Sequence, residues 1–358
     1  MKSLPLAFVF AMAVPTTLPN LQLPPVPPPI NAPKLAPLLG DATAGLVTTR
    51  RAWHDERADL RTRWLAVLGA LPVDRAPLNA KVLTTEELPT FTRQHLTYQI
   101  EDGVWTDGYL LTPKGVRGRV PAMVVFHPTI ATHTAQVSGR DASEFDRMHG
   151  VHFVERGYLV WTPRCFIFDD RPDVTGGAVY TANVNTMQAR HPHWTGMLRM
   201  TFDAMRAADF VTSLPNVDTR RVGAFGHSLG AKEALYAAAF DERYQVAVFS
   251  EGGIGLGFSN WEAVWYLGPQ IKQPEFRREH HELLGLIAPR AFLLLAGNSA
   301  DDDRSWSFIA AALPVYQLLG ASDRIGWWNH GQGHRYSAEA RAVTLAFVGK
   351  WLRAKTVR

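Results

Sequence analysis

The stretch Arg221-Val-Gly-Ala-Phe-Gly-His-Ser-Leu-Gly-Ala-Lys-Glu-Ala-Leu235 decides how the rest of the sequence is interpreted. An apolar run leads into Gly226-His-Ser-Leu-Gly230, and a helix-forming run from Ala231 to Phe240 follows directly. Strand, Gly-x-Ser-x-Gly and helix in this order are typical of a sharp turn that presents a serine hydroxyl above the edge of a sheet. The two glycines have no Cβ, so strand and helix can approach closely. We therefore predict that Ser228 is a nucleophile; a Gly-Ser turn without chemistry is the alternative.

A serine hydroxyl needs a neighbouring base, and the base needs an acid that fixes its tautomer. When the nucleophile lies in such a turn, the order of the three catalytic residues along the chain is serine, acid and histidine. His334 lies in a glycine-bearing loop just before the last helix and is the predicted base, with His330 as the alternative.

Two places compete for the acid. The loop after the strand 291–296 carries Asp301, Asp302 and Asp303, and Glu251 follows the strand 244–250. A carboxylate on the first of these loops is the common arrangement, and Asp303 is the best placed to cap the following helix. We therefore prefer Asp301 and keep Glu251 as its rival.

The oxyanion formed during ester hydrolysis needs two backbone N–H donors. Leu229 follows the serine at a helix N-terminus and supplies the first. The second comes from the loop after Phe126, where Pro128 has no N–H, so Thr129 or Ile130 must donate. No cofactor or metal is expected, because six other histidines show no metal-ligand spacing and are predicted to be surface or packing residues. They are His149, His152, His191, His193, His280 and His281.

Alternating strands and helices predict an α/β fold. A hairpin with Asp102-Gly103 at its turn begins the sheet, and wholly apolar runs such as 122–126 suit strands that are buried on both faces. The expectation is a doubly wound, mostly parallel sheet with helices on both faces. The predicted strands are 81–85, 91–100, 105–111, 122–126, 158–162, 221–225, 244–250, 291–296 and 323–328, and the predicted helices are 44–71, 194–214 and 338–352.

The N-terminus predicts export. Lys2 is followed by an apolar run that ends in Ala11-Met-Ala13, which is typical of a cleaved signal peptide over residues 1–13. The run is about half as long as a bilayer span, so no stable membrane anchor is expected. Residues 14–40 are rich in proline and predict an extended linker, and residues 41–358 form the predicted catalytic domain with an N-terminal helical extension.

Composition excludes several classes of protein. Of the 358 residues, 46% are hydrophobic and 20% are charged, a balance that can bury a sizeable core. The net charge is +4, but the Lys and Arg residues are scattered, so no nucleic-acid partner is expected. Cys165 is the single cysteine, which excludes an internal disulfide.

Four stretches resemble carbohydrate esterases of the α/β-hydrolase fold, the acetylxylan esterase-like and glucuronoyl esterase-like enzymes. They are Gly226-His-Ser-Leu-Gly-Ala-Lys-Glu-Ala-Leu235, Phe240-Asp-Glu-Arg-Tyr244, Ser250-Glu-Gly-Gly253 and Ile287-Ala-Pro-Arg290. The resemblance implies a substrate-binding lysine at Lys232 and an acid at Glu251. Glucuronoyl esterases have an arginine directly after the serine, and this chain has Leu229 there.

The segment from Gly252 to Glu282 is long for a connection between two strands. We expect it to be an insertion that covers the active site, with Trp261 stacking on a sugar ring; core packing of that ring is the alternative. The predicted function is an exported, secreted or periplasmic serine esterase acting on small-molecule or polysaccharide esters. The alternatives are a prolyl-oligopeptidase-like serine peptidase and a non-catalytic glycan-binding relative.

Overall fold

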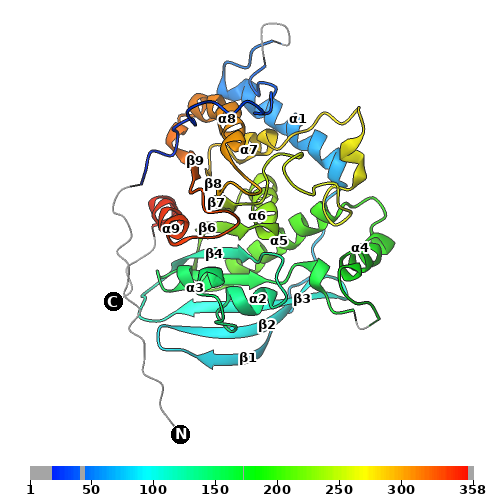
Figure 1. The fold of residues 1–358 in the computed structure, drawn as a ribbon. Helices are drawn as coiled ribbons and strands as arrows, with labels where there is room; N and C mark the ends of the chain where they lie inside the picture. Colours follow the sequence, from blue (N-terminus) through cyan, green and yellow to red (C-terminus); the bar gives the residue numbers. More distant parts are fainter. Residues whose placement is uncertain (1–17, 41–44, 172, 354–358) are drawn as a thin grey trace.

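The computed structural model describes residues 18–40, 45–171 and 173–353 and has one nine-stranded sheet at its centre (Figure 1). The predicted signal peptide lies outside the described residues. The strands are β1 (Lys81–Glu87), β2 (Phe91–Glu101), β3 (Val104–Pro113), β4 (Val120–Phe126), β5 (Leu159–Pro163), β6 (Val217–His227), β7 (Tyr244–Ser250), β8 (Ala291–Ala296) and β9 (Ile325–Asn329). They are ordered β1-β2-β3-β5-β4-β6-β7-β8-β9, with β1 to β3 antiparallel and β4 to β9 parallel to one another.

Alternation of side chains along the central strands builds two cores. In β4, Ala122, Val124 and Phe126 join the core on one face, whereas Met123 and Val125 join the core on the other. Because successive side chains of a strand point to opposite faces, a strand covered on both sides must be apolar throughout. The predicted α/β fold, with a doubly wound and mostly parallel sheet, is confirmed.

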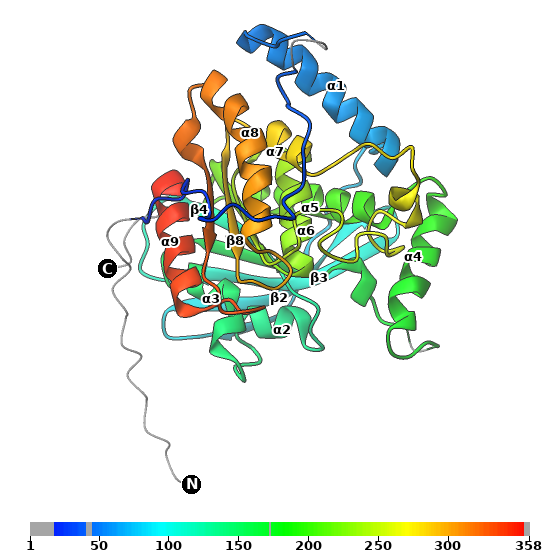
Figure 2. The same ribbon diagram turned by 45° about the horizontal axis from the view of Figure 1, so that its top comes forward.

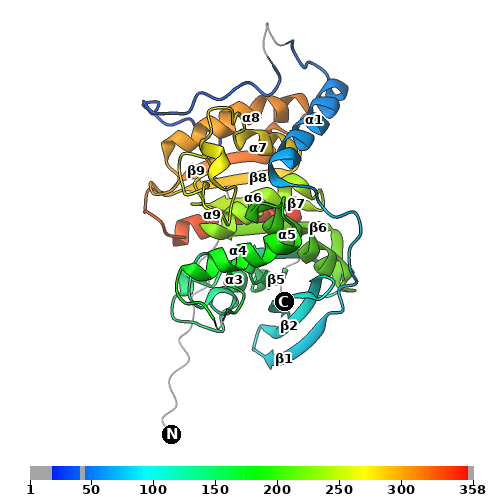
Figure 3. The same ribbon diagram turned by 90° about the vertical axis from the view of Figure 1, so that its right-hand side faces the viewer.

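Helices cover both faces of the sheet (Figure 3). The larger core is shared with α1 (Arg50–Leu68), α4 (Ala178–Arg190), α5 (Gly196–Ser213), α6 (Leu229–Phe240), α7 (His281–Ile287) and α8 (Trp306–Leu318). The smaller core is shared with α3 (His149–Val154) and α9 (Ala338–Leu352), and the short α2 (His133–Val137) lies beside α3. In the part of the chain that the structure describes, no helix is long and apolar enough to cross a membrane.

The N-terminal extension is held against the catalytic domain. Thr49 caps α1 by accepting a hydrogen bond from the Ala52 N–H, and the helix buries Trp53, Leu60, Trp64 and Leu68. The proline-rich segment before it, predicted as a linker, runs along the domain (dark blue in Figure 2). Its Leu21 carbonyl accepts a 2.8 Å hydrogen bond from the Trp327 N–H in the edge strand β9. The segment is therefore extended and packs against the domain, because it supplies a hydrogen-bond acceptor for the edge strand β9 of the sheet.

Candidate active site

Ser228 stands at a sharp turn between a strand and a helix. It lies between the end of β6 and the first residue of α6, with φ 58° and ψ −118°. A non-glycine residue rarely adopts this backbone conformation, which is strained and persists where its surroundings hold it. Here the Ser228 N–H donates a 2.8 Å hydrogen bond to the Ser250 carbonyl at the end of β7. The predicted strand, turn and helix around the serine are all present.

Two glycines make this turn possible. A Cβ on Gly226 would lie 1.9 Å from the Gly230 carbonyl oxygen, and a Cβ on Gly230 would lie 2.2 Å from the Phe126 carbonyl oxygen. Both contacts are with backbone atoms, which cannot rotate away as a side chain could. The glycines of the Gly-x-Ser-x-Gly pattern are therefore required by the close approach of α6 to β4 and β6.

The Gly226→Ala substitution tests this packing. We expect it to lower the free energy of unfolding by about 3 kcal/mol, because the added methyl overlaps fixed backbone atoms. Urea unfolding followed by circular dichroism measures the change. The matched control is Gly257→Ala, since a Cβ there meets nothing within 4 Å; it should stay within about 0.5 kcal/mol. Equal stability of the two variants would contradict the packing argument.

Ser228 and His334 line the same cleft, which has a volume of about 360 Å³. Thr129 belongs to this cleft too. The cleft opens at the carboxyl ends of the parallel strands, because Ser228 follows β6 and His334 follows β9. This is the edge at which α/β sheets bind ligands. The other lining residues are Pro128, Ile130, Glu144, Asp146, Arg147, His149, His227, Arg335 and Tyr336.

Glu251 is the carboxylate in contact with His334. Its Oε2 lies 3.2 Å from His334 Nδ1, and its side chain is fully buried. The same carboxylate accepts hydrogen bonds from the N–H groups of Gly297 and Ala300 (2.9 Å for Ala300). Glu251 itself has φ 52°, so the chain turns abruptly after β7. These contacts fix the carboxylate and leave the other ring nitrogen of His334, Nε2, directed away from it.

The preference for Asp301 over Glu251 is corrected by these contacts. Asp301 is fully buried, and its two oxygens accept hydrogen bonds from the N–H groups of Gly253 (2.7 Å) and Ile254 (2.8 Å) and from the Ser305 hydroxyl (2.8 Å). Burial raises the pKa of Asp301 to about 6, although these donors favour its ionised form. Asp301 therefore ties the loop after β7 to the start of α8.

The remaining acid and base candidates have other partners. Asp302 pairs with Arg304 at 2.7 Å and caps the short turn before α8, and Asp303 accepts a 2.8 Å hydrogen bond from the Asn329 amide. His330 Nδ1 accepts from the Gln332 N–H at 3.2 Å. None of the three lines the cleft.

The predicted oxyanion donors come from two elements. Leu229 is the first residue of α6, where an N–H has no partner within the helix. Thr129 follows β4 and lines the cleft together with Pro128 and Ile130. Leu229 therefore lies at a helix N-terminus, where N–H groups can bind an anion, and the role of both residues stays a prediction.

Lys232 and Trp261 do not line the cleft, so their assignment to substrate binding stays a prediction. The Lys232 ammonium donates to the Ser259 hydroxyl (2.9 Å) and the Asn260 side-chain oxygen (3.0 Å), and it lies 4.0 Å from the centre of the Tyr266 ring. Burial lowers the pKa of Lys232 to about 7. Trp261 is fully buried and donates to the Gly253 carbonyl at 2.7 Å. The long segment after β7 thus uses its aromatic rings for its own packing.

Several cleft residues carried no signal in the sequence. His149 is almost fully buried as expected for a packing residue, but its ring lies against Phe225 and Tyr336 and forms part of the cleft wall. Arg147 and Arg335 bring guanidinium groups to the same cleft, where Arg147 is paired with Glu144 at 3.1 Å. Arg335 could have been found from its place next to His334, whereas Arg147 comes from a distant loop that folding brings close.

Comparison with known proteins identifies related enzymes. A protein of Bacillus subtilis (strain 168) named as a hydrolase, YtaP, is 25% identical over 318 residues, which are 83% of this chain and 100% of that protein. The 4-O-methyl-glucuronoyl methylesterase 1 of Sodiomyces alcalophilus is 30% identical over 174 residues, which are 39% of this chain and 34% of that enzyme. No family model matches the chain.

A solved structure of a glucuronoyl esterase from Solibacter usitatus has the same fold. It superposes with a TM-score of 0.68 at 17% identity and covers 89% of this chain and 98% of its own. The resemblance inferred from the stretch around Ser228 is thus confirmed: the chain has the α/β-hydrolase fold and is similar to carbohydrate esterases.

Proposed function

We propose that the protein is a serine esterase that hydrolyses carboxylic esters of carbohydrates through an acyl-enzyme. The observation that carries this proposal is the contact between Glu251 and His334. The buried Glu251 carboxylate accepts hydrogen bonds from two backbone N–H groups, and its Oε2 lies 3.2 Å from His334 Nδ1. His334 lines the same cleft as the strained Ser228. A nucleophile, a base and an orienting acid on these three loops form the arrangement that activates a serine hydroxyl.

In the proposed reaction, Ser228 Oγ attacks the ester carbonyl and His334 Nε2 takes the hydroxyl proton. Glu251 accepts the hydrogen bond from Nδ1–H and stabilises the imidazolium that forms. The N–H groups of Leu229 and Thr129 stabilise the carbonyl oxygen as it becomes negative. His334 then gives its proton to the leaving alcohol, and the acyl group stays on Ser228. Water attacks this ester with His334 as the base, which releases the carboxylic acid and restores the serine.

The substrate class follows from the cleft and the relatives. The named relatives include 4-O-methyl-glucuronoyl methylesterases, so uronic acid esters of carbohydrates are the first candidates. The Arg335 guanidinium lines the cleft and can donate to the oxygen acceptors of such a substrate, whereas Arg147 is paired with Glu144 at 3.1 Å. Leu229 stands where glucuronoyl esterases have an arginine, so the oxyanion depends on backbone donors here.

The experiment that tests the proposal compares esters on the purified protein. We expect the protein to hydrolyse p-nitrophenyl acetate. We also expect a higher kcat/KM than on that ester with either methyl glucuronate or acetylated xylan, and the better of these two substrates identifies the acid part of the natural ester. A fluorophosphonate probe should label Ser228 and no other residue. Absence of both hydrolysis and labelling would contradict the esterase and favour a glycan-binding protein, and hydrolysis of peptides alone would favour a peptidase.

Export is part of the proposal, because a polysaccharide substrate lies outside the cell. The motif Ala11-Met-Ala13 predicts a mature protein that begins near Val14. N-terminal sequencing of the protein from its native host measures this, and an intact Met1 on the cytoplasmic protein would contradict it.

A further inference from the structure

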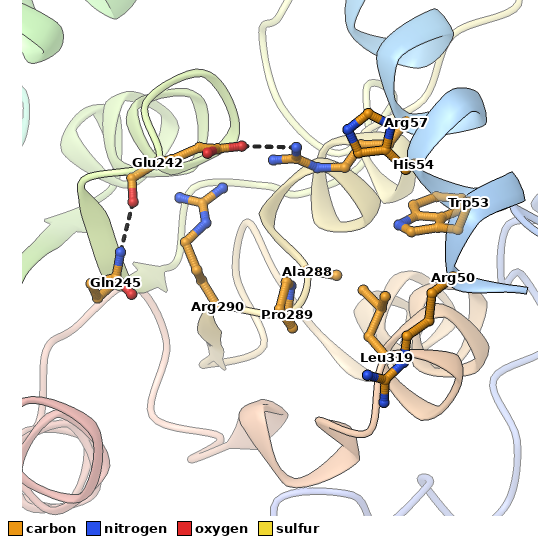
Figure 4. Close-up of a pocket in the computed structure, with 10 residues that line it drawn as sticks. All are labelled: Arg50, Trp53, His54, Arg57, Glu242, Gln245, Ala288, Pro289, Arg290 and Leu319. Atoms are coloured by element: carbon orange, nitrogen blue, oxygen red, sulfur yellow. Dashed lines mark hydrogen bonds and ion pairs between the residues drawn. The ribbon is translucent and has the colours of Figure 1, made fainter.

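A second cavity, with a volume of about 350 Å³, lies far from the cleft of Ser228. It is formed by α1, the turns that precede β7 and β8, and the end of α8 (Figure 4). Gln245 and Arg290 line it at the amino ends of β7 and β8, whereas Ser228 follows the carboxyl end of the parallel strand β6. The second cavity therefore lies at the amino ends of the parallel strands, and the cleft of Ser228 lies at their carboxyl ends.

An unpaired hydrogen-bond donor lies in its wall. Trp53 is 1% exposed, and its indole Nε1 has no hydrogen-bond partner among the described residues. The other end of the ring packs on α7, where a Cβ added to Gly285 would lie 3.2 Å from Trp53 Cη2. In Figure 4 the nitrogen edge of the indole faces the space between α1 and Pro289. A buried N–H without an acceptor is unfavourable, so an acceptor atom placed in this space would be bound.

The charge of the cavity is positive. Arg290 is 7% exposed and donates to the carbonyl oxygens of Asp241, Tyr244 and Leu286, and within the described ranges it forms no ion pair with a carboxylate. Burial, followed by the nearby charge of Arg57, lowers the pKa of Arg290 to about 10. The guanidinium still carries its charge at neutral pH, and an anion would be attracted to it.

Two further guanidinium groups lie at the rim. Arg57 is paired with Glu242 at 2.8 Å, so their charges compensate each other (Figure 4). Arg50 is exposed, and its side chain donates a 3.4 Å hydrogen bond to the Leu318 carbonyl. In Figure 4 the Arg50 side chain extends past Leu319, so its guanidinium adds positive charge on the side of the cavity away from the Trp53 donor.

The rest of the wall is apolar. Leu319, Ala288 and Pro289 face the same space as the indole ring. An inorganic anion would leave these side chains in contact with water, whereas an organic anion would cover them. An occupant with a negative group at one end and an apolar body therefore matches the cavity better than a simple ion.

We propose that this cavity binds a small organic carboxylate with an apolar body. The carboxylate accepts a hydrogen bond from the Trp53 N–H in the positive field of Arg290 and Arg50, and the apolar body packs on Leu319 and Pro289. Because Trp53 and Arg50 belong to α1 while Arg290 directly precedes β8, the bound molecule joins the N-terminal extension to the rest of the protein. This proposal does not depend on the activity at Ser228.

Isothermal titration calorimetry with phenylacetate tests the proposal on the whole protein. The ligand should bind, and its neutral counterpart phenylacetamide should bind at least about tenfold more weakly because the charge-assisted hydrogen bond is lost. Trp53→Phe keeps the aromatic ring, removes only the donor and should weaken binding about tenfold or more. Arg50→Gln should weaken it several-fold, and the matched control Arg51→Gln, an exposed neighbour outside the cavity, should leave it unchanged.

Four results would overturn the proposal. They are no binding of phenylacetate, equal binding to the Trp53→Phe protein, tighter binding of inorganic phosphate than of phenylacetate, and loss of binding after a fluorophosphonate has blocked Ser228. The last would place the ligand in the catalytic cleft. Circular dichroism of each variant shows whether it is folded, and Arg50→Gln changes an exposed side chain, so it provides a test even if Trp53→Phe is unstable.

Discussion

Ser228→Ala should lower kcat for ester hydrolysis by about 10⁶. The hydroxyl is the atom that the proposed mechanism joins covalently to the substrate, so neither His334 nor the backbone donors can replace it. The turn itself should survive, since alanine also has a Cβ and the Ser228 N–H bond to the Ser250 carbonyl involves only the backbone. The variant should therefore remain folded and keep the ability to bind its substrate.

Steady-state kinetics on p-nitrophenyl acetate and fluorophosphonate labelling measure this effect together. The matched control is Ser213→Ala, which removes an exposed hydroxyl at the end of α5 and should keep full activity and labelling. Retention of more than about one hundredth of the wild-type kcat by Ser228→Ala would exclude Ser228 as the nucleophile, because the remaining groups of such a site support far slower hydrolysis.

The sheet was predictable because its strands are determined by local sequence. The strands at 244–250 and 291–296 and the helix at 338–352 begin and end at the predicted residues. Each strand is an apolar run bounded by polar or glycine residues, and a strand buried on both faces needs that composition. The helix α4 (Ala178–Arg190) was missed, because it buries only Asn183, Val184 and Met187 and carries a weak apolar pattern.

The site was predictable only as far as local geometry determines it. The turn at Ser228 depends on neighbours in the sequence, and Gly226 and Gly230 are visible there. The partner of His334 depends on how two loops pass each other after β7 and β8. Asp301 and Glu251 both follow a strand of the parallel sheet, and nothing in either stretch states which of the two carboxylates points to the histidine.

The environments of Lys232 and Trp261 could not be predicted from the sequence. Lys232 was assigned to the substrate through the family resemblance and Trp261 through its place in the insertion. In the structure the Lys232 ammonium is enclosed by Ser259, Asn260 and Tyr266 of that insertion. A sequence shows that an aromatic ring is present and leaves open which of its faces are covered.

Replacement of the two competing carboxylates gives the second large effect. Glu251→Gln should lower kcat by about 10⁴, since the histidine then lacks an acceptor that holds the reactive tautomer. The Glu251 carboxylate receives the Gly297 and Ala300 N–H groups as well as His334. The amide of glutamine at position 251 has one oxygen in place of two. Its NH₂ group must therefore face either the His334 ring nitrogen or a backbone N–H, and it cannot accept a hydrogen bond from either. Both orientations disturb the pair.

Asp301→Asn should act differently. Its amide can still accept from one of the Gly253 and Ile254 N–H groups, and the loss of the other acceptor should lower the free energy of unfolding by about 1–3 kcal/mol. The effect on kcat should be about tenfold, because Asp301 supports the loop of Glu251 without touching His334. Urea unfolding and steady-state kinetics on the same preparations separate the two effects.

A double-mutant cycle makes the assignment of Glu251 independent of any stability loss. If Glu251 acts only through His334, the double variant Glu251→Gln, His334→Ala should be no slower than His334→Ala alone. Asp301→Asn combined with His334→Ala should instead lower activity further, since its effect on the loop persists without the histidine. Two results would instead identify Asp301 as the acid. One is a larger loss of kcat in Asp301→Asn than in Glu251→Gln while both proteins are folded, and the other is an Asp301→Asn change that has no further effect once His334 is replaced. Glu251, at 3.2 Å from the His334 ring, would then serve only to hold the loop.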